Sequence, residues 1–156
     1  MPVVVGMRLR RQRLRLEVLT KLASRILQSI DESEAVLSLE IVGDVRMRRL
    51  NRTFRQRDKT TDVLAFATRE GPGPPSALLG DVVISLPQAL RQSRHHARGV
   101  DYELVVLLIH GILHLCGYDH ERSEREARRM RRREQAVLRA IGRIPRLLVS
   151  GDSDRV

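Results

Sequence analysis

The stretch from His110 to His120, which reads HGILHLCGYDH, holds three histidines in the spacing H-x3-H-x5-H. On a helix, residues four apart lie about 40° apart around the axis and about 6 Å along it, so His110 and His114 project from one face, as two ligands of one metal ion must. Gly117 suits the left-handed position that ends a helix, after which the chain can bring His120 back to the same centre. Three imidazoles without an obvious fourth protein ligand are typical of a catalytic zinc site, in which water keeps the open position.

The same spacing, glycine included, occurs in zinc peptidases with the motif HExxHxxGxxH, but one position differs. Their glutamate after the first histidine is the general base that activates water. Here that position is Gly111, which has no proton-accepting side chain. The sequence therefore favours zinc–water chemistry on a different kind of substrate. Cys116, the only cysteine, would lie about 200° around the helix from His114, so we interpret it as a buried thiol and not as a fourth ligand.

The bulk composition bounds the class of protein. The chain has 156 residues, 42% of them hydrophobic, which is enough for one domain with a proper core. No apolar run approaches the roughly 20 residues of a membrane span, and the basic residues follow a short apolar run at the start, which is the reverse of a secretory signal. A single cysteine can form no intramolecular disulfide, so we expect a reducing, cytoplasmic location.

The charge points to polyanionic partners. The formal net charge is +10, and of the 29 basic residues only Lys21 and Lys59 are lysines. Arginine suits two-pronged contacts with phosphate, so nucleic acid is the expected partner. The alternative is a solvated arginine-rich surface, and the arginines of residues 122–133, interleaved with glutamates, fit that interpretation better. Aromatic residues are scarce, which disfavours a base-stacking platform, so we expect RNA contacts to run mainly through phosphates.

The pattern of elements predicts an α+β fold (an α/β sandwich). Strands are expected over residues 3–9, 35–42, 61–68 and 80–86, with a loop at 71–75, and helices over 12–30, 44–54, 87–97, 101–115 and 123–141. Asp44 and Asp101 can cap two of these helices, and Ser123 with Glu126 forms a possible capping box. The prediction is one mixed sheet of about four strands packed with about five helices, with the zinc site at the end of a helix in the C-terminal half. Residues 1–142 would form a single catalytic domain, and residues 143–156 a poorly ordered tail.

Three blocks of the sequence together resemble the YbeY family of bacterial endoribonucleases, which act in rRNA maturation. HGILHLCGYDH resembles the zinc signature of that family, LNRTFRQRDKTTDVLAFA its central motif, and LGDVVIS its third block, in the same order and spacing. The resemblance covers roughly residues 35–142. Ala65 and Ala67 replace a usual serine and proline, Asp62 stands where asparagine is also common, and Cys116 occupies a typically apolar position; none of these departures touches the expected ligands.

The resemblance implies a zinc-dependent, single-strand-specific endoribonuclease that acts in 16S rRNA 3′-end maturation and ribosome quality control. Its partners would be single-stranded RNA, rRNA, the small ribosomal subunit and associated proteins, with no membrane. One zinc ion per chain would be held by His110, His114 and His120. Arg55 matches the arginine of the family's pocket and is the candidate for holding the phosphate. Asp62 and Asp81 are candidates for orienting a ligand histidine or handling a proton, with capping at a strand edge as the alternative.

Two other functions remain open from the sequence. One is a non-catalytic ribosome assembly factor in which zinc is structural, and the other is a zinc peptidase-like hydrolase without the usual glutamate base. The open coordination position favours an enzyme, and Gly111 disfavours the peptidase. For an RNA substrate, attack by water and attack by the RNA 2′-hydroxyl are both compatible with the residues present.

Overall fold

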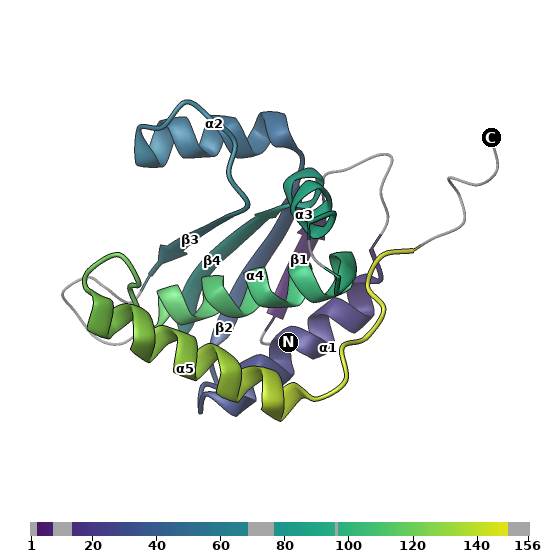
Figure 1. The fold of residues 1–156 in the computed structure, drawn as a ribbon, viewed down its shortest axis with the longest axis vertical. Helices are drawn as coiled ribbons and strands as arrows, with labels where there is room; N and C mark the ends of the chain where they lie inside the picture. The colour runs from purple at the N-terminus through teal and green to yellow at the C-terminus, as the bar shows by residue number, and fades with distance from the viewer. Residues whose placement is uncertain (1–2, 8–13, 69–76, 96, 150–156) are drawn as a thin grey trace.

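The computed structural model describes residues 3–7, 14–68, 77–95 and 97–149. The expected loop at 71–75 lies outside these residues. The elements of the described part are, in chain order, β1 (Val3–Met7), α1 (Leu16–Ser29), β2 (Val36–Val42), α2 (Asp44–Arg55), β3 (Val63–Ala67), β4 (Leu78–Ser85), α3 (Leu86–Ser93), α4 (Gly99–Leu115) and α5 (Glu124–Ile141) (Figure 1).

The four strands form one mixed sheet in the order β1-β2-β4-β3. β1 pairs with β2 and β2 with β4 in parallel, whereas β3 runs antiparallel to β4 and lies at the edge. A mixed sheet of four strands with five helices, counted over the described residues, confirms the predicted α+β fold. The antiparallel register joins Val63 to Ile84 at one end and Ala67 to Gly80 at the other, which places the whole of β3 along the free edge.

The helices divide between the two faces of the sheet. The large core joins α1, α4 and α5 to one face, and Figure 1 shows these three helices lying across the same side. α2 covers the other face through a small separate cluster, in which Met47 packs against Val42, Leu64 and Val83. Successive residues of a strand point to opposite faces, so Val82 faces α4 and Val83 faces α2.

α2 is held at both ends, and this fixes the position of its last residue, Arg55. At the N-terminal end the carboxylate of Asp44 accepts hydrogen bonds from Arg91 at 2.8 and 2.9 Å, from Thr60 and from Ser85. The hydrogen bond from Arg91 holds the pKa of the Asp44 carboxyl below its usual value. Asp44 thus ties α2 to α3 and β4, whereas Gly43 occupies the capping position that the sequence assigned to Asp44. At the other end Asn51, 3% exposed, donates to the carbonyl oxygen of Lys59 at 2.9 Å.

α4 is the central helix of the molecule and is buried around most of its circumference. Nine of its residues are buried, because the sheet covers one side and other helices cover the rest: Leu104, Val105, Leu107, Leu108, Ile109, Gly111, Ile112, Leu113 and Leu115. No helix among the described residues is long and apolar enough to cross a bilayer.

Gly111 is the point at which α4 lies closest to the sheet. A Cβ atom at this position would lie 2.7 Å from Cγ1 of Val82 and 3.3 Å from Cγ2 of Val63. Real Cβ atoms do not approach a neighbouring carbon so closely, so any larger residue must push the helix and the sheet apart. A glycine here therefore allows the helix backbone to lie directly against β3 and β4.

The segment after α5 differs from the expected poorly ordered tail. Gly142 ends α5 with φ of 76°, as the sequence suggested. Leu147 is then fully buried in the main core, and Leu148 forms a bridge with Leu14. The carboxylate of Asp101, which the sequence assigned to a helix cap, instead accepts hydrogen bonds from the backbone N–H groups of Leu147 and Leu148 at 2.9 Å. The tail is therefore packed through residue 148, and residues 150–156 lie outside the described part.

The close contact at Gly111 generates a stability prediction. We expect Gly111→Ala to destabilise the protein by about 1–2 kcal/mol, because overpacking costs up to about 3 kcal/mol and exceeds the gain of about 1 kcal/mol in helix propensity. Val82→Ala alone should also destabilise, because Val82 is fully buried, but the double variant should lose less than the sum of the two single losses, since the new methyl group fills space that the valine leaves. Urea unfolding of the two single variants and the double variant measures this coupling.

Gly6→Ala is the matched control for this experiment, because a Cβ atom at Gly6 would have none of the described residues within 4 Å, and Gly6 does not have a positive φ. It should leave stability unchanged within about 0.5 kcal/mol. Additive effects of Gly111→Ala and Val82→Ala would contradict the proposed contact.

Candidate metal centre

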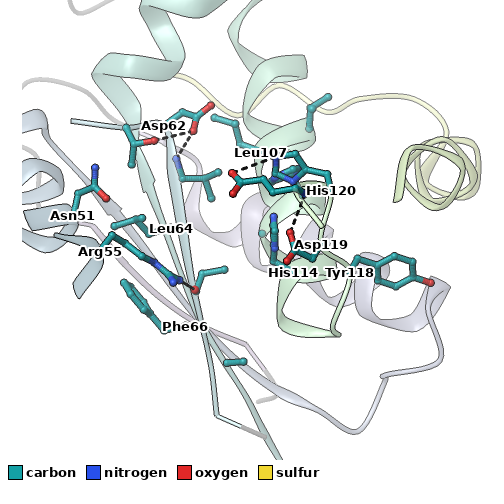
Figure 2. Close-up of a pocket in the computed structure, with 18 of the residues that line it drawn as sticks. Asn51, Arg55, Asp62, Leu64, Phe66, Leu107, His114, Tyr118, Asp119 and His120 are labelled. Atoms are coloured by element: carbon teal, nitrogen blue, oxygen red, sulfur yellow. Dashed lines mark hydrogen bonds and ion pairs between the residues drawn. The ribbon is translucent and has the colours of Figure 1, made fainter. Parts of the chain in front are cut away.

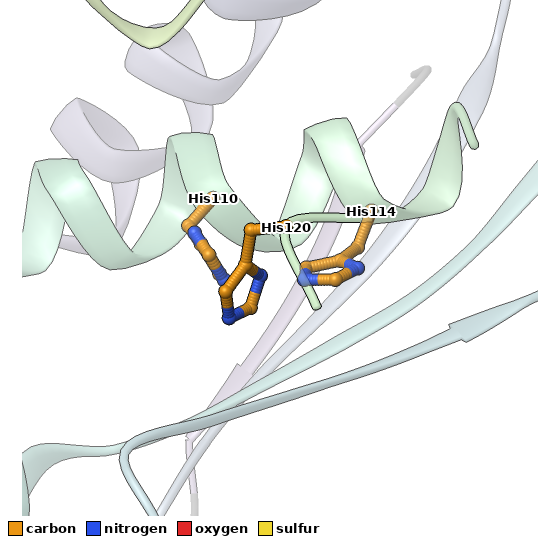
Figure 3. Close-up of side chains that lie close together, drawn as sticks. All are labelled: His110, His114 and His120. Atoms are coloured by element: carbon orange, nitrogen blue, oxygen red, sulfur yellow. The ribbon is translucent and has the colours of Figure 1, made fainter. Parts of the chain in front are cut away.

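The three histidines of the motif converge at the C-terminal end of α4 (Figure 3). Each pair of imidazole rings is in edge contact, with ring centroids 4.7, 4.9 and 5.3 Å apart. The convergence predicted from the spacing H-x3-H-x5-H is therefore present. His110 and His114 come from consecutive turns of α4, and His120 comes from the loop that follows.

The loop turns back because of local backbone bonds that end α4. Gly117 adopts φ of 97°, a left-handed conformation that disfavours larger residues, and its N–H donates to the carbonyl oxygen of His114 at 3.0 Å. The N–H of Tyr118 donates to the carbonyl oxygen of Leu113 at 3.1 Å. The carboxylate of Asp119 accepts from the N–H of Glu121 at 3.0 Å and so closes the turn that carries His120.

The donor set fits a metal ion. One ligand atom from each histidine lies within 4.8 Å of the other two. Tetrahedral zinc with bonds of about 2.0–2.1 Å needs nitrogen atoms roughly 3.4 Å apart, so small rotations of the side chains would close the site. The side chain of His110 is 25% exposed and that of His120 is 42% exposed, so the cluster opens to one side. Cys116 is not part of this group, which is the only such group found among the described residues.

The environment of His114 favours its neutral imidazole. Burial lowers the pKa of His114, and the neighbouring His110 and His120 lower that pKa further when they carry charge. A neutral imidazole has a nitrogen lone pair for a metal ion, whereas an imidazolium has none. The surroundings of His114 therefore support the form of this side chain that binds a metal.

Glu134 of α5 is a site residue that the sequence interpretation missed. Its Oε2 lies 3.8 Å from Nδ1 of His110, and its side chain is only 19% exposed. A carboxylate beside Nδ1 leaves the other ring nitrogen, Nε2, for a metal ion. Glu134 directly follows the arginine-rich segment 122–133, whose sequence predicts an exposed charged face, and the only signal for its role is its helical spacing from Glu126, Met130 and Leu138.

The histidines open into a cavity of about 1160 Å³ whose walls come from three parts of the chain. One wall is α4 with the loop after it, the second is β3, and the third is the end of α2 with the residues that follow it (Figure 2). Four basic side chains line this cavity, namely Arg55, Arg57, Lys59 and Arg122, together with four acidic ones, Asp62, Glu103, Asp119 and Glu121. The arrangement can therefore hold an anion next to a metal ion.

Arg55 lies on the last turn of α2 and reaches the edge strand. Its Nη2 donates to the carbonyl oxygen of Ala65 at 2.6 Å, and its Cζ lies 5.3 Å from the ring centroid of Phe66. The side chain is exposed and lines the cavity that contains the histidines. The structure thus brings Arg55 to the candidate site, across β3 from His114 and His120 (Figure 2).

The two candidate carboxylates occupy different places. Asp62 lines the cavity, and its carboxylate accepts hydrogen bonds from the N–H of Val63 at 2.7 Å and from Gln92 at 3.2 Å. These contacts hold the start of β3, so the capping alternative applies to Asp62 at least in part. Asp81 lies opposite Phe66 in the strand register, on the α2 face of the sheet, and does not line the cavity. The structure does not bring Asp81 to the histidines.

The peptidase alternative meets a steric obstacle. The position of the peptidase glutamate is Gly111, which is buried against Val82 and Val63 and has no space for even a Cβ atom. A carboxylate there would point into the sheet and not toward the histidines. The position next to His110 is therefore used for packing and cannot supply a general base.

A family model and individual relatives point to the same family. A family model described as Endoribonuclease YbeY matches residues 7–142. The Endoribonuclease YbeY of Syntrophotalea carbinolica is 45% identical over 137 residues, which are 86% of this chain and 91% of that protein. The protein of the same name from Geobacter metallireducens is 40% identical over 146 residues, 92% of this chain and 97% of the relative.

A solved structure has the same fold. The solution structure of TM1509 from Thermotoga maritima aligns with a TM-score of 0.62 at 21% identity, over 89% of this chain and 88% of that one. Because the family model spans well over half of the residues and two relatives of at least 40% identity are covered over more than nine tenths of their length, this chain belongs to the YbeY family.

Proposed function

We propose that this chain is a zinc-dependent endoribonuclease that cleaves single-stranded RNA in 16S rRNA 3′-end maturation and ribosome quality control, in the cytoplasm and at the small ribosomal subunit. The observation that carries this proposal is the cluster of His110, His114 and His120, which opens into a cavity lined by arginine and lysine. The family supports it, since the relatives are named endoribonucleases. The formal net charge of +10 also favours an RNA partner.

Zinc is the proposed metal because three imidazoles and an open position are typical of its catalytic sites. When bound, one zinc ion per chain would supply Lewis-acid chemistry toward a phosphoryl oxygen and a water molecule. The three histidines would hold the ion through neutral ring nitrogens. Glu134 would keep Nδ1 of His110 protonated and the ring fixed in orientation, which makes it a positioning residue.

The basic walls would hold the RNA strand. Arg55 presents a planar guanidinium at the edge of the cavity, where it can place two N–H donors on the oxygens of one phosphate. Charge on those oxygens grows in the transition state of phosphodiester cleavage, so a fixed guanidinium lowers the barrier. Arg57 and Lys59 form no ion pair within the described residues and would contact neighbouring phosphates.

The first prediction concerns the metal. The purified protein should bind about one zinc ion per chain, and His114→Ala should lose most of it, because two imidazoles remain. His95→Ala is the matched control, since His95 is an exposed histidine outside the cluster, and it should bind zinc as the parent chain does. Elemental analysis of dialysed protein measures both. Full zinc content in His114→Ala would remove this site from the proposal.

The second prediction separates catalysis from folding. Arg55→Ala should slow single-turnover cleavage of a single-stranded RNA about 100- to 1,000-fold, because it removes a donor that acts most strongly in the transition state. Arg55→Lys should recover part of the rate, since lysine keeps the charge but loses the fork. Zinc content and melting temperature should stay near the parent values, because the side chain is exposed.

Arg52→Ala provides the control for Arg55. Arg52 lies on the same helix, 59% exposed, and its guanidinium lies 3.7 Å from Asp58, outside the cavity. Its loss should change the cleavage rate little. Equal rates for the Arg55 and Arg52 variants would exclude Arg55 from the reaction, whereas lost zinc or lost stability in Arg55→Ala would assign it a structural role.

The third prediction tests the positioning role of Glu134. Glu134→Gln should weaken zinc binding about 10- to 100-fold in chelator competition, because the amide cannot hold the His110 ring as a carboxylate does. Glu126→Gln, on the same helix with a 25% exposed side chain paired to Arg129, should leave zinc affinity unchanged. Thermal melting of the metal-free proteins checks that both variants fold. Unaltered zinc affinity in Glu134→Gln would show that the 3.8 Å contact has no effect on the metal site.

A further inference from the structure

A pair of aromatic rings, Phe54 exposed and Phe66 half-buried, stands beside the cavity at the end of α2 and on β3. The rings of Phe54 and Phe66 meet edge to face, with centroids 5.4 Å apart and planes inclined at 62°. Phe54 is 57% exposed, which makes it the only strongly exposed aromatic side chain among the described residues. Arg55 completes the group, since its guanidinium lies 5.3 Å from the centre of the Phe66 ring.

The packing of the small core explains only part of this arrangement. Phe66 packs against the cluster formed by Val42, Met47, Leu64 and Val83, so one side of its ring has a structural role. Phe54 touches Phe66 and is more than half exposed. Residues at this end of α2 have no need of an aromatic ring to close the core, because Met47 and Leu50 already cover it.

Phe54 stands outside the lining of the cavity that contains the histidines, and the pair reaches this cavity through Phe66. Phe66 and Arg55 line it, and Figure 2 shows both across β3 from His114 and His120. A strand that passes over the edge of β3 would therefore meet the histidines on one side and the rings on the other. The basic residues Arg57 and Lys59 line the cavity as well, so cations as well as an aromatic ring are available along this path.

This combination selects among ligands. Aromatic faces beside unpaired cations are the elements with which proteins hold single-stranded nucleic acids, since each base has a face to stack and each phosphate a charge to neutralise. A base in a duplex is already stacked and paired, so its face is not accessible to a side chain. An apolar peptide would satisfy the rings but would leave the basic wall without a partner.

We propose that Phe54 and Phe66, with Arg55 at their edge, form a stacking subsite for one unpaired nucleobase next to the scissile phosphate. The proposal rests on the proposed function, because the stacked base would belong to the nucleotide next to the phosphate that lies at the histidines. It supplies a physical reason for a preference for single strands. It also adds a base contact to the expectation, drawn from the scarcity of aromatic residues, that RNA contacts run mainly through phosphates.

The experiment measures binding and not cleavage, so that it is independent of the metal chemistry. Fluorescence anisotropy measures how tightly the full-length protein, in the presence of a chelator, binds a short single-stranded RNA. The same measurement is made with a series of oligonucleotides that each lack one base. Removal of one particular base should weaken binding about fivefold or more to the parent protein, the smaller end of the range for stacking on an aromatic side chain. A duplex of the same sequence should show no such dependence.

The variants test the rings themselves. Phe54→Leu, and Phe54→Leu with Phe66→Leu, keep apolar packing but remove the aromatic face. Both should bind intact RNA more weakly, the double variant about fivefold or more, and neither should lose further affinity when the critical base is absent. Val45→Ala is the control on the same helix, because Val45 is 75% exposed and lies outside the cavity, and it should bind as the parent does.

Each outcome decides the proposal. The subsite would be overturned if the parent and Phe54→Leu were equally sensitive to the missing base. Misfolding would not explain that result, because the Phe54 side chain is exposed. Binding that depends on no base at all would also overturn it, even if the protein cleaves RNA. A base-dependent, ring-dependent affinity in a protein that cleaves no RNA with zinc would support the subsite and overturn the proposed catalysis instead. If the protein bound an apolar peptide more tightly than RNA, the rings would be a peptide site and the proposed base-stacking subsite would be wrong.

Discussion

The close approach of α4 to the sheet is the constraint on which the metal centre depends. Gly111 places no side chain between the helix and Val82, so the helix backbone can lie against the sheet. His110 and His114 flank this contact and are carried by a helix that cannot slide without opening a buried core. Ligands must be held to within about 0.5 Å for a site to work, and a buried helix supplies that rigidity better than a loop.

The same contact limits the chemistry at the site. A carboxylate at position 111 would be buried among the methyl groups of Val82 and Val63 with no partner, which is costly. The residue next to His110 therefore cannot activate water as the peptidase glutamate does. Cleavage of a phosphodiester depends more on positioning and on charge stabilisation than on a covalent role for the protein, and the basic walls of the cavity fit that requirement.

Interactions between residues close in the sequence could be predicted, whereas contacts between distant segments could not. The histidine spacing and the capping box of Ser123 with Glu126 are local, so helix geometry alone predicts them, and Ser123 does accept from the N–H of Glu126 at 3.1 Å. The contacts of Glu134 with His110 and of Asp101 with Leu147 join distant segments. No periodicity reports such contacts, because they depend on how α4 and α5 pack. The sequence predicts Asp101 as a helix cap for the same reason, because it indicates the helix that Asp101 begins but not the distant segment that packs against it.

The edge position of β3 places it between the histidines on one side and Arg55 with Phe66 on the other. An edge strand presents unpaired backbone groups that invite another strand, and proteins usually cover or block them. Here Arg55 donates to the carbonyl oxygen of Ala65, which occupies one of those groups with a side chain from another element. The contact makes β3 a poorer template for a further strand, while its two faces carry Val63 toward α4 and Phe66 toward α2. The antiparallel addition of β3 at the edge, in an otherwise parallel sheet, therefore brings residues from both faces of the sheet, Val63 and Phe66, into the lining of one cavity.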